Sequence, residues 1–423
     1  YITDQTLDMV DGSYRIADPA VPTRYYLNGK HMKAKRDMTT AVTEFESTKP
    51  GRTNIAFPQQ KYATSLGKGQ YDHSNKLITM EADDRYRNSA NVTQFITTDP
   101  SLHGLKFSAN RCNLDLKQEQ MRVGGVDSIL VADAVIFTDG QELLLDGKGV
   151  MDKIQDARIR CRNGGQEHLF TNAWVDIISG ISYHAVGSYP YIKVDSVQQV
   201  IDFDDIFVRP DTVTVAKTFI PEDKGFFLTD RFYFKDTVEL VANQKYMNFR
   251  GKVKIQSRNP ALSESWIAVN IPNANPDSIV VTIDKKNIGD RINGVVLLGE
   301  RHGYHSLFLN HPLSKRDKPI LQAVGVITFD RVSREFKIGP MEKIKRQRYG
   351  GNLVSYYEGD NGEEIITSEG IYEFPFNFSR DAIEKNGQAA KIQMAGRWRF
   401  DGFHPHRSSG HRSADAARTP VAV

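Results

Sequence analysis

The sequence predicts an all-β protein, either an elongated β-solenoid or β-jellyroll or a set of stacked β-sandwich sheets, with few short helices. Short runs of β-branched and aromatic residues, separated by Gly, Asp, Asn or Pro, fill the stretch from 126 to 255. Within many of these runs the apolar residues recur at every second position, which places them on one face of a strand. We therefore expect helix in under about a fifth of the residues, against the usual third.

The composition is that of a globular chain and not of a disordered one. The chain has 423 residues, of which 39% are hydrophobic and 10% aromatic, and this length is enough for two or three domains. The 55 basic and 52 acidic residues leave a net charge of +3, which argues against a dedicated nucleic-acid-binding protein. No run approaches the roughly 18 apolar residues of a membrane-spanning helix. The chain starts at Tyr1 and not at Met, which is a hint of a removed export signal.

Residues 1–120 form a predicted N-terminal β-rich region with long loops. The basic patch at 31–36 could contact phosphate or an acidic surface, or it could be a solvated strand or loop. Cys112 shares a strand face with Leu114 and Leu116, which indicates a buried thiol. The second cysteine is Cys161, and two cysteines cannot support a disulfide framework. Two separate free thiols are the simpler interpretation, and a single disulfide is the alternative.

Residues 121–258 form a predicted continuous β-sheet domain. Asp139-Gly140 is typical of a tight turn between two strands. The segments 234–240 and 249–255 share one pattern: Phe, a basic residue, two variable positions, Val, a charged residue and an aliphatic residue. This echo predicts that Phe234 and Phe249 occupy equivalent inward positions in successive strands or coils.

A cluster of Pro and Asn at 256–290 is the best candidate for a domain junction, followed by a second β domain at 285–402. Within that domain we expect a helical turn or two at 341–348, a hairpin turn at 358–364 and a short helix at 379–387. The tail at 403–423 is rich in His, Arg, Ser and Ala, and we expect it to be disordered.

Two clusters have residue types that bind metals, and each has a simpler interpretation. Asp202 and Asp204 lie on one strand face and could hold Ca²⁺, or they could form the acidic outer face of a half-buried strand. His302, His305 and His311 follow a spacing that matches no zinc pattern and could be plain loop histidines. No nucleotide or hydrolase motif stands in the required context. We therefore expect no cofactor and assign no catalytic residues.

The polar loop at 301–318 is the predicted contact surface for a partner. It mixes positive charges with apolar side chains, a combination suited to a polar-rimmed interface, and a mobile loop without a partner is the alternative. The candidate binding residues are Arg301, Phe308, Leu313, Lys315, Arg316 and Lys318.

Three stretches resemble known proteins in the overall pattern of their residues: 125–137, 168–191 and 232–255. They resemble large exported β-repeat envelope proteins of Bacteroidota and, more loosely, the OstA- or LptA-type β-jellyroll strands of lipopolysaccharide transport. The resemblance covers about 104–352 and rests on no diagnostic motif. It implies a periplasmic or cell-surface location and a stacking or bridging role.

The predicted function is therefore that of a non-enzymatic structural or assembly protein of the bacterial cell envelope, acting through sheet edges and loops. Its partners would be other envelope proteins or a second copy of itself. The alternative is a carbohydrate-binding or carbohydrate-active protein that uses aromatic residues such as Trp174, Trp266 or Trp398 beside carboxylates. A lipid or lipopolysaccharide conduit is a lesser alternative.

Overall fold

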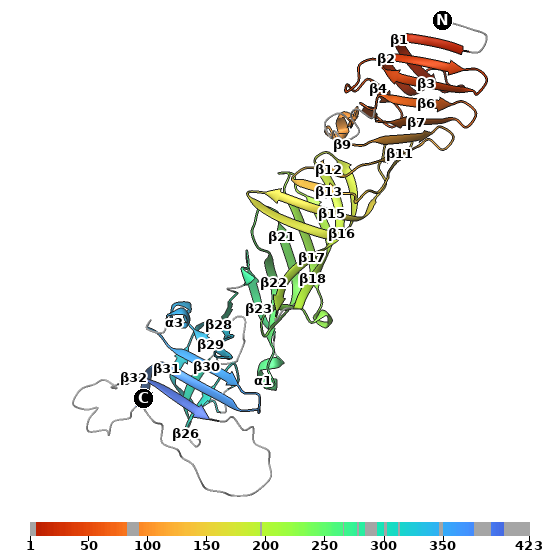
Figure 1. Cartoon of the computed structure of the whole chain (residues 1–423). Coiled ribbons are helices and arrows are strands. Elements are labelled where there is room, and N and C mark those ends of the chain that lie inside the picture. Colours follow the sequence, from red (N-terminus) through yellow and green to blue (C-terminus); the bar gives the residue numbers. More distant parts are fainter. Residues whose placement is uncertain are drawn as a thin grey trace, which may run out of the picture. The chain divides into compact units, whose positions relative to one another are not determined.

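The computed structural model describes residues 6–82, 93–194, 197–264, 266–276, 279–283, 294–299, 303–311, 314–346, 350–375 and 391–401. Of these residues, 61% lie in strands and 5% in helices, so the all-β class and the scarcity of helix are confirmed. The chain forms two compact units. Figure 1 labels their strands and helices. The first unit contains Tyr1–Ile192, Gln198–Thr218 and Glu239–Met247, and the second contains Lys193–Val197, Phe219–Val238 and Asn248–Val423.

The first unit begins with two antiparallel ladders that share the strand β2. The first 14 strands and one 3-10 turn are β1 (Thr6–Ala17), β2 (Tyr25–Asp37), β3 (Val42–Ser47), β4 (Ile55–Phe57), β5 (Tyr62–Thr64), β6 (Lys68–Asp72), β7 (Leu77–Glu81), β8 (Gln94–Thr97), η1 (Pro100–Leu102), β9 (Lys106–Ser108), β10 (Arg111–Asp115), β11 (Gln120–Gly124), β12 (Ser128–Val131), β13 (Ala134–Phe137) and β14 (Leu143–Leu145). One ladder runs β1, β2, β3, β6, β7, β10, β11, β14. The other runs β2, β4, β5, β8, β9, β12, β13 and continues into β15.

The two ladders form the layers of a sandwich, because the chain crosses between them hairpin by hairpin. The hairpin β6–β7 belongs to one ladder, and the hairpins β4–β5 and β8–β9 belong to the other. Connections such as 65–67 and 125–127 can span only about 10 Å, which is the usual spacing of packed sheets. Large side chains that are at most 4% exposed fill the interior: Phe45, Phe57, Tyr62, Phe95, Phe107, Leu114, Met121 and Ile129.

Longer strands follow in the central stretch. They are β15 (Ile154–Asn163), β16 (Gln166–Ser179), β17 (Ser182–Val194), β18 (Val197–Val208), β19 (Thr214–Ile220), η2 (Glu222–Lys224), β20 (Phe227–Thr229), β21 (Phe232–Val241), β22 (Asn248–Ile255), α1 (Pro260–Ser263) and β23 (Trp266–Ile271). The predicted turn between β13 and β14 is confirmed, because Asp139 and Gly140 have φ angles of 51° and 85°. Cys112 and Cys161 are both buried free thiols, as the simpler interpretation held.

The segments 234–240 and 249–255 share a sequence pattern that predicts equivalent inward positions for Phe234 and Phe249. The burial of both strands confirms this prediction. Phe234, Val238 and Leu240 of β21 are at most 1% exposed, and the same holds for Phe249, Val253 and Ile255 of β22. The rings of Phe234 and Phe249 meet edge to face, with their centroids 5.1 Å apart. The repeated pattern therefore encodes two neighbouring strands of one core.

The second unit contains two further sheets and a short helix: β24 (Val281–Ile283), β25 (Gly294–Gly299), β26 (Gly303–Leu307), β27 (Lys318–Ala323), β28 (Gly325–Asp330), β29 (Glu335–Gly339), α3 (Met341–Lys345), β30 (Leu353–Glu358), β31 (Glu364–Pro375) and β32 (Lys391–Asp401). One sheet has the order β24, β28, β29, β30, β31, β32, and the other has the order β26, β25, β27. The helix α3 and the hairpin turn between β30 and β31 lie where the sequence predicts them. The predicted helix at 379–387 and the tail at 403–423 lie outside the described residues.

The predicted domain boundaries can be compared with two features of the structure: the change from one sheet to the next and the division into compact units. The change of sheet between β23 and β24 falls inside the Pro and Asn cluster at 256–290. The two compact units divide instead within the central stretch, between 192 and 248.

Candidate binding surfaces

The predicted contact loop at 301–318 is partly a strand. β26 pairs with β25 in the register Val295↔Leu307 to Gly299↔Gly303, so only the residues after Leu307 connect β26 to β27. Arg301 and Leu313 lie outside the described residues. Phe308 is 4% exposed and stacks on Tyr356 with the ring centroids 5.4 Å apart, so it belongs to the core and not to an exposed contact surface.

The three remaining candidates lie on the surface beside β27. Lys315, Arg316 and Lys318 are exposed. Asp317 holds this turn in place, because its carboxylate accepts a hydrogen bond from the backbone N–H of Ser314 at 3.1 Å. The buried carboxylate therefore fixes the turn while the neighbouring cations face solvent.

β27 is an edge strand beside a groove. It pairs with β25 along one side, and no other described strand pairs with it. The groove has a volume of about 420 Å³. Its lining residues are Pro319, Ile320, Leu321, Gln322, Gly351, Asn352, Ile371 and Glu373. The side-chain amide of Asn352 donates to the carbonyl of Gln322 at 2.9 Å, which shows that the main chain of Gln322 points toward this groove.

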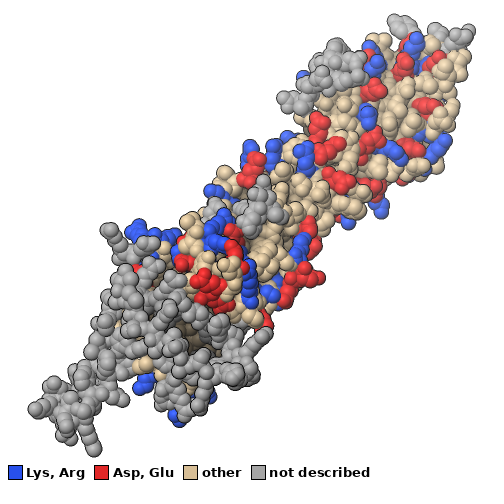
Figure 2. Space-filling view, turned by 60° about the horizontal axis from the view of Figure 1, so that its bottom comes forward, with Lys and Arg blue, Asp and Glu red and all other residues tan. Residues whose placement is uncertain are grey.

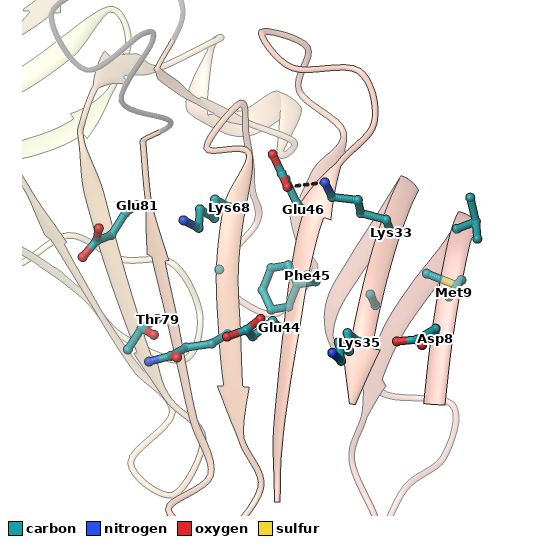
Figure 3. A pocket seen from close by; sticks show the side chains of 14 residues that line it. Asp8, Met9, Lys33, Lys35, Glu44, Phe45, Glu46, Lys68, Thr79 and Glu81 are labelled. Carbon is teal, nitrogen blue, oxygen red and sulfur yellow. Dashed lines mark ion pairs between the residues drawn. The ribbon is translucent and has the colours of Figure 1, made fainter. Parts of the chain in front are cut away.

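A second groove lies on strands β1, β2, β3, β6 and β7 of the first unit (Figure 3). Its volume is about 660 Å³, within the range of small-molecule pockets. Its charged lining alternates in sign across the strands, with Lys33 paired to Glu46 at 2.6 Å and Lys68 next in register. The basic patch at 31–36 is thus part of a strand whose Lys33 is neutralised by a neighbouring carboxylate.

The aspartates of β18 are engaged with the neighbouring strands. Asp202 accepts a hydrogen bond from the Ser188 hydroxyl of β17 at 2.9 Å. Asp204 accepts one from the Thr218 hydroxyl of β19 at 2.8 Å. Because the two carboxylates contact opposite neighbours, they do not converge on one point. Within the described ranges, no group of three His, Cys, Asp or Glu side chains could hold a metal ion.

The predicted histidine cluster is only partly described. His305 is 15% exposed and its Nε2 lies 3.4 Å from Asp317, whereas His311 is exposed and His302 lies outside the described residues. The described part therefore brings one histidine to one carboxylate.

Most aromatic residues of the central strands fill the core. Tyr183, Phe226 and Phe232 are at most 2% exposed. Burial raises the pKa of Tyr183 well above its ordinary value, because the phenolate would lose hydration. Trp174 is different, since it is 51% exposed on β16, opposite Val186 of β17. Of the three tryptophans, Trp174 thus presents an open ring, and the side chain of Trp398 lies outside the described part.

The chain matches no protein-family model, and no curated protein or solved structure matches it. Among the described residues, no helix is long and apolar enough to cross a membrane.

Proposed function

We propose that this protein is a non-enzymatic structural or assembly component of the bacterial cell envelope that binds extended segments of its partners at sheet edges. The observation that carries the proposal is the edge strand β27, whose outward main chain borders the 420 Å³ groove. An edge strand offers N–H and C=O groups that a partner strand completes by hydrogen bonding.

The geometry of β27 suits strand addition. In an antiparallel sheet the N–H and C=O of one residue point to the same side and alternate along the strand. Gln322 directs its main chain into the groove, and the pairing of β27 with β25 shifts register at Ile320, so the regular alternation covers Leu321 to Ala323. The exposed side chain of Ile371, 46% exposed, supplies an apolar contact on the groove floor.

The charges near β27 select the partner. Lys315, Arg316 and Lys318 are exposed at the start of the strand, and Glu373 lines the groove farther along. An extended segment with acidic residues at the end that meets Lys318 fits this arrangement. The cell-envelope location and the identity of the partners as envelope proteins, or as a second copy of the chain, follow from the sequence resemblance over about 104–352.

The main-chain contact can be tested with a matched pair of variants. Gln322→Pro removes the outward N–H of an exposed residue, whereas Gln322→Ala keeps it. We expect pull-down from native membranes, followed by binding of the recovered partner in purified form, to fail for Gln322→Pro and to succeed for Gln322→Ala. Circular dichroism serves as the control for folding. Equal affinity of both variants for the purified partner would contradict strand addition at β27.

The charged turn is tested separately. The double variant Arg316→Glu/Lys318→Glu reverses two exposed charges, and exposed loop positions seldom carry stability. We expect weaker binding of the same partner with an unchanged thermal midpoint. The double variant Lys117→Glu/Lys148→Glu, at exposed turns of the first unit, is the control for overall charge.

Carbohydrate binding is the second candidate function, and the exposed Trp174 favours it. An open indole ring can stack on a sugar. Ser188 on the adjacent strand β17 and Asp202 on β18, which are hydrogen-bonded to each other, add a hydroxyl and a carboxylate. Trp174→Ala should then abolish binding to a neutral glycan array without affecting the β27 partner. Glycan hydrolysis that is lost on mutating one carboxylate would overturn the non-enzymatic proposal.

A further inference from the structure

One strand of the second unit carries a row of positive charges on its outward face. Arg250, Lys252 and Lys254 alternate on β22 with the buried residues Phe249 and Val253. Alternate residues of a strand are about 6.6 Å apart, so the three cations are evenly spaced over about 13 Å. We call these residues, together with Lys235 of β21, the β22 basic strip.

An indole ring holds two cations of the strip in place. The ammonium groups of Lys235 and Lys254 lie 4.2 and 4.8 Å from the ring centroid of Trp266 on β23. Glu222 contacts both, at 2.7 Å from Lys235 and 3.6 Å from Lys254. The hydrogen bond from Lys235 lowers the pKa of Glu222, so this carboxylate stays ionised at neutral pH.

The other half of the strip faces no counter-charge on the β23 side, and on the β21 side Asp236 lies beside Gly251. The register of β22 and β23 places Ala268 opposite Lys252 and Asn270 opposite Arg250. Both cations are exposed, and no ion pair joins them to another described residue. Lys33 of the first unit, in contrast, has Glu46 directly opposite it.

The local charge balance is therefore positive. The strip contains four cations. Three carboxylates lie on β21 and η2: Glu222, which already contacts Lys235 and Lys254; Asp236, which accepts a hydrogen bond from the Thr237 hydroxyl; and Glu239, which pairs with Lys217 of β19 at 3.2 Å. Figure 2 shows acidic and basic side chains interspersed over much of the face it displays. A strip with excess positive charge is an exception to this mixed pattern.

We propose that the β22 basic strip binds an anionic polysaccharide, whose carboxylate or phosphate groups contact Arg250 and Lys252 and compete with Glu222 for Lys254. The row of cations fits a linear ligand with repeated negative charges. The side-chain amide of Asn270 and the hydroxyl of Thr237 lie on the neighbouring strands and suit the hydroxyl groups of a sugar chain.

The surroundings favour a polysaccharide over other anionic polymers. Single-stranded nucleic acids bind where bases stack on open aromatic rings, and here two lysines cover the ring of Trp266. A lipid surface would require exposed apolar side chains, and the outward neighbours on β23 are Ala268 and Asn270.

The test measures binding of the full chain to fluorescently labelled polygalacturonate oligosaccharides by anisotropy. The double variant Arg250→Ala/Lys252→Ala should bind at least tenfold more weakly than the wild type. Arg122→Ala/Lys148→Ala removes two exposed cations from the first unit and should bind as the wild type does. Glu222→Gln should bind severalfold more tightly, because it removes the competing carboxylate. Affinity should fall as salt is raised from about 0.05 to 0.5 M.

Several results would overturn the assignment. Wild-type affinity in the Arg250→Ala/Lys252→Ala variant would exclude the strip as the site. Equal binding of uncharged dextran would show that charge is not what is recognised. Tighter binding of single-stranded DNA or of phosphatidylglycerol vesicles than of polygalacturonate would assign the strip to another class of ligand. None of these results depends on the β27 edge, so the two proposals can fail independently.

Discussion

Removing either ring of the Phe234–Phe249 pair should destabilise the second unit strongly. Both side chains are at most 1% exposed and meet edge to face at 5.1 Å. Replacing a buried Phe by Ala costs about 3 to 5 kcal/mol through lost transfer free energy and the cavity left behind. The aromatic contact itself contributes about 0.5 to 1.5 kcal/mol of this cost. The double variant should therefore lose less than the sum of the two single variants by about that amount.

Urea denaturation followed by tryptophan fluorescence and circular dichroism measures the effect. With a denaturant dependence of about 1 to 3 kcal/mol per molar, a loss of 3 kcal/mol lowers the midpoint by at least about 1 M. The two compact units can unfold separately, so the transition that reports Trp266 is the relevant one.

Phe219→Ala is the matched control, because Phe219 is in the same unit but 60% exposed. Its midpoint should move by no more than about 0.5 kcal/mol in free energy. Single variants of Phe234 and Phe249 that unfold at the wild-type midpoint would refute the inward placement of both rings. Strictly additive losses in the double variant would refute the direct contact between them.

Three further predictions concern the first unit. Cys112 and Cys161 should not react with a thiol reagent until urea unfolds the unit, because burial raises the pKa of both thiols, that of Cys161 to about 12. Burial lowers the pKa of His168, so the unfolded state binds the proton more readily and stability should fall as pH drops below about 6.5; His168→Gln should flatten this dependence between pH 7 and 5. Gly149→Ala should lower the thermal midpoint more than Gly140→Ala, since both have positive φ but a Cβ on Gly149 would lie 2.0 Å from a backbone oxygen, whereas nothing lies within 4 Å of one on Gly140.

Local patterns predicted the elements that depend only on neighbouring residues. Alternation along 249–255 predicts both the strand β22 and its buried face. The turn at Asp139-Gly140 and the short helix α3 also follow from residues within a few positions of each other. The burial of Cys112 follows from its alternation with Leu114 and Leu116.

The predicted binding loop shows where local patterns fail. The segment of β26 contains Tyr304, His305 and Ser306, which read as a polar loop. It becomes a strand because it pairs with the apolar strand β25, and this pairing stabilises it from outside the segment. Phe308, directly after β26, packs against Tyr356 of β30, a residue far along the chain that no local pattern connects to it.

The sequence by itself determined the strands whose apolar residues alternate, such as β22, and which side of them is apolar, because alternation is a property of a few consecutive residues. Only the tertiary structure decided which strands pair, since pairings such as β3 with β6 and β5 with β8 pass over an intervening hairpin. Pairing in turn decides which surface groups are open to a ligand. It leaves one side of β27 without a paired strand among the described residues, and it places Glu46 opposite Lys33 but Ala268 opposite Lys252. Whether a charge is neutralised or available to a ligand depends on the strand beside it, and that neighbour is chosen by contacts far apart in the sequence.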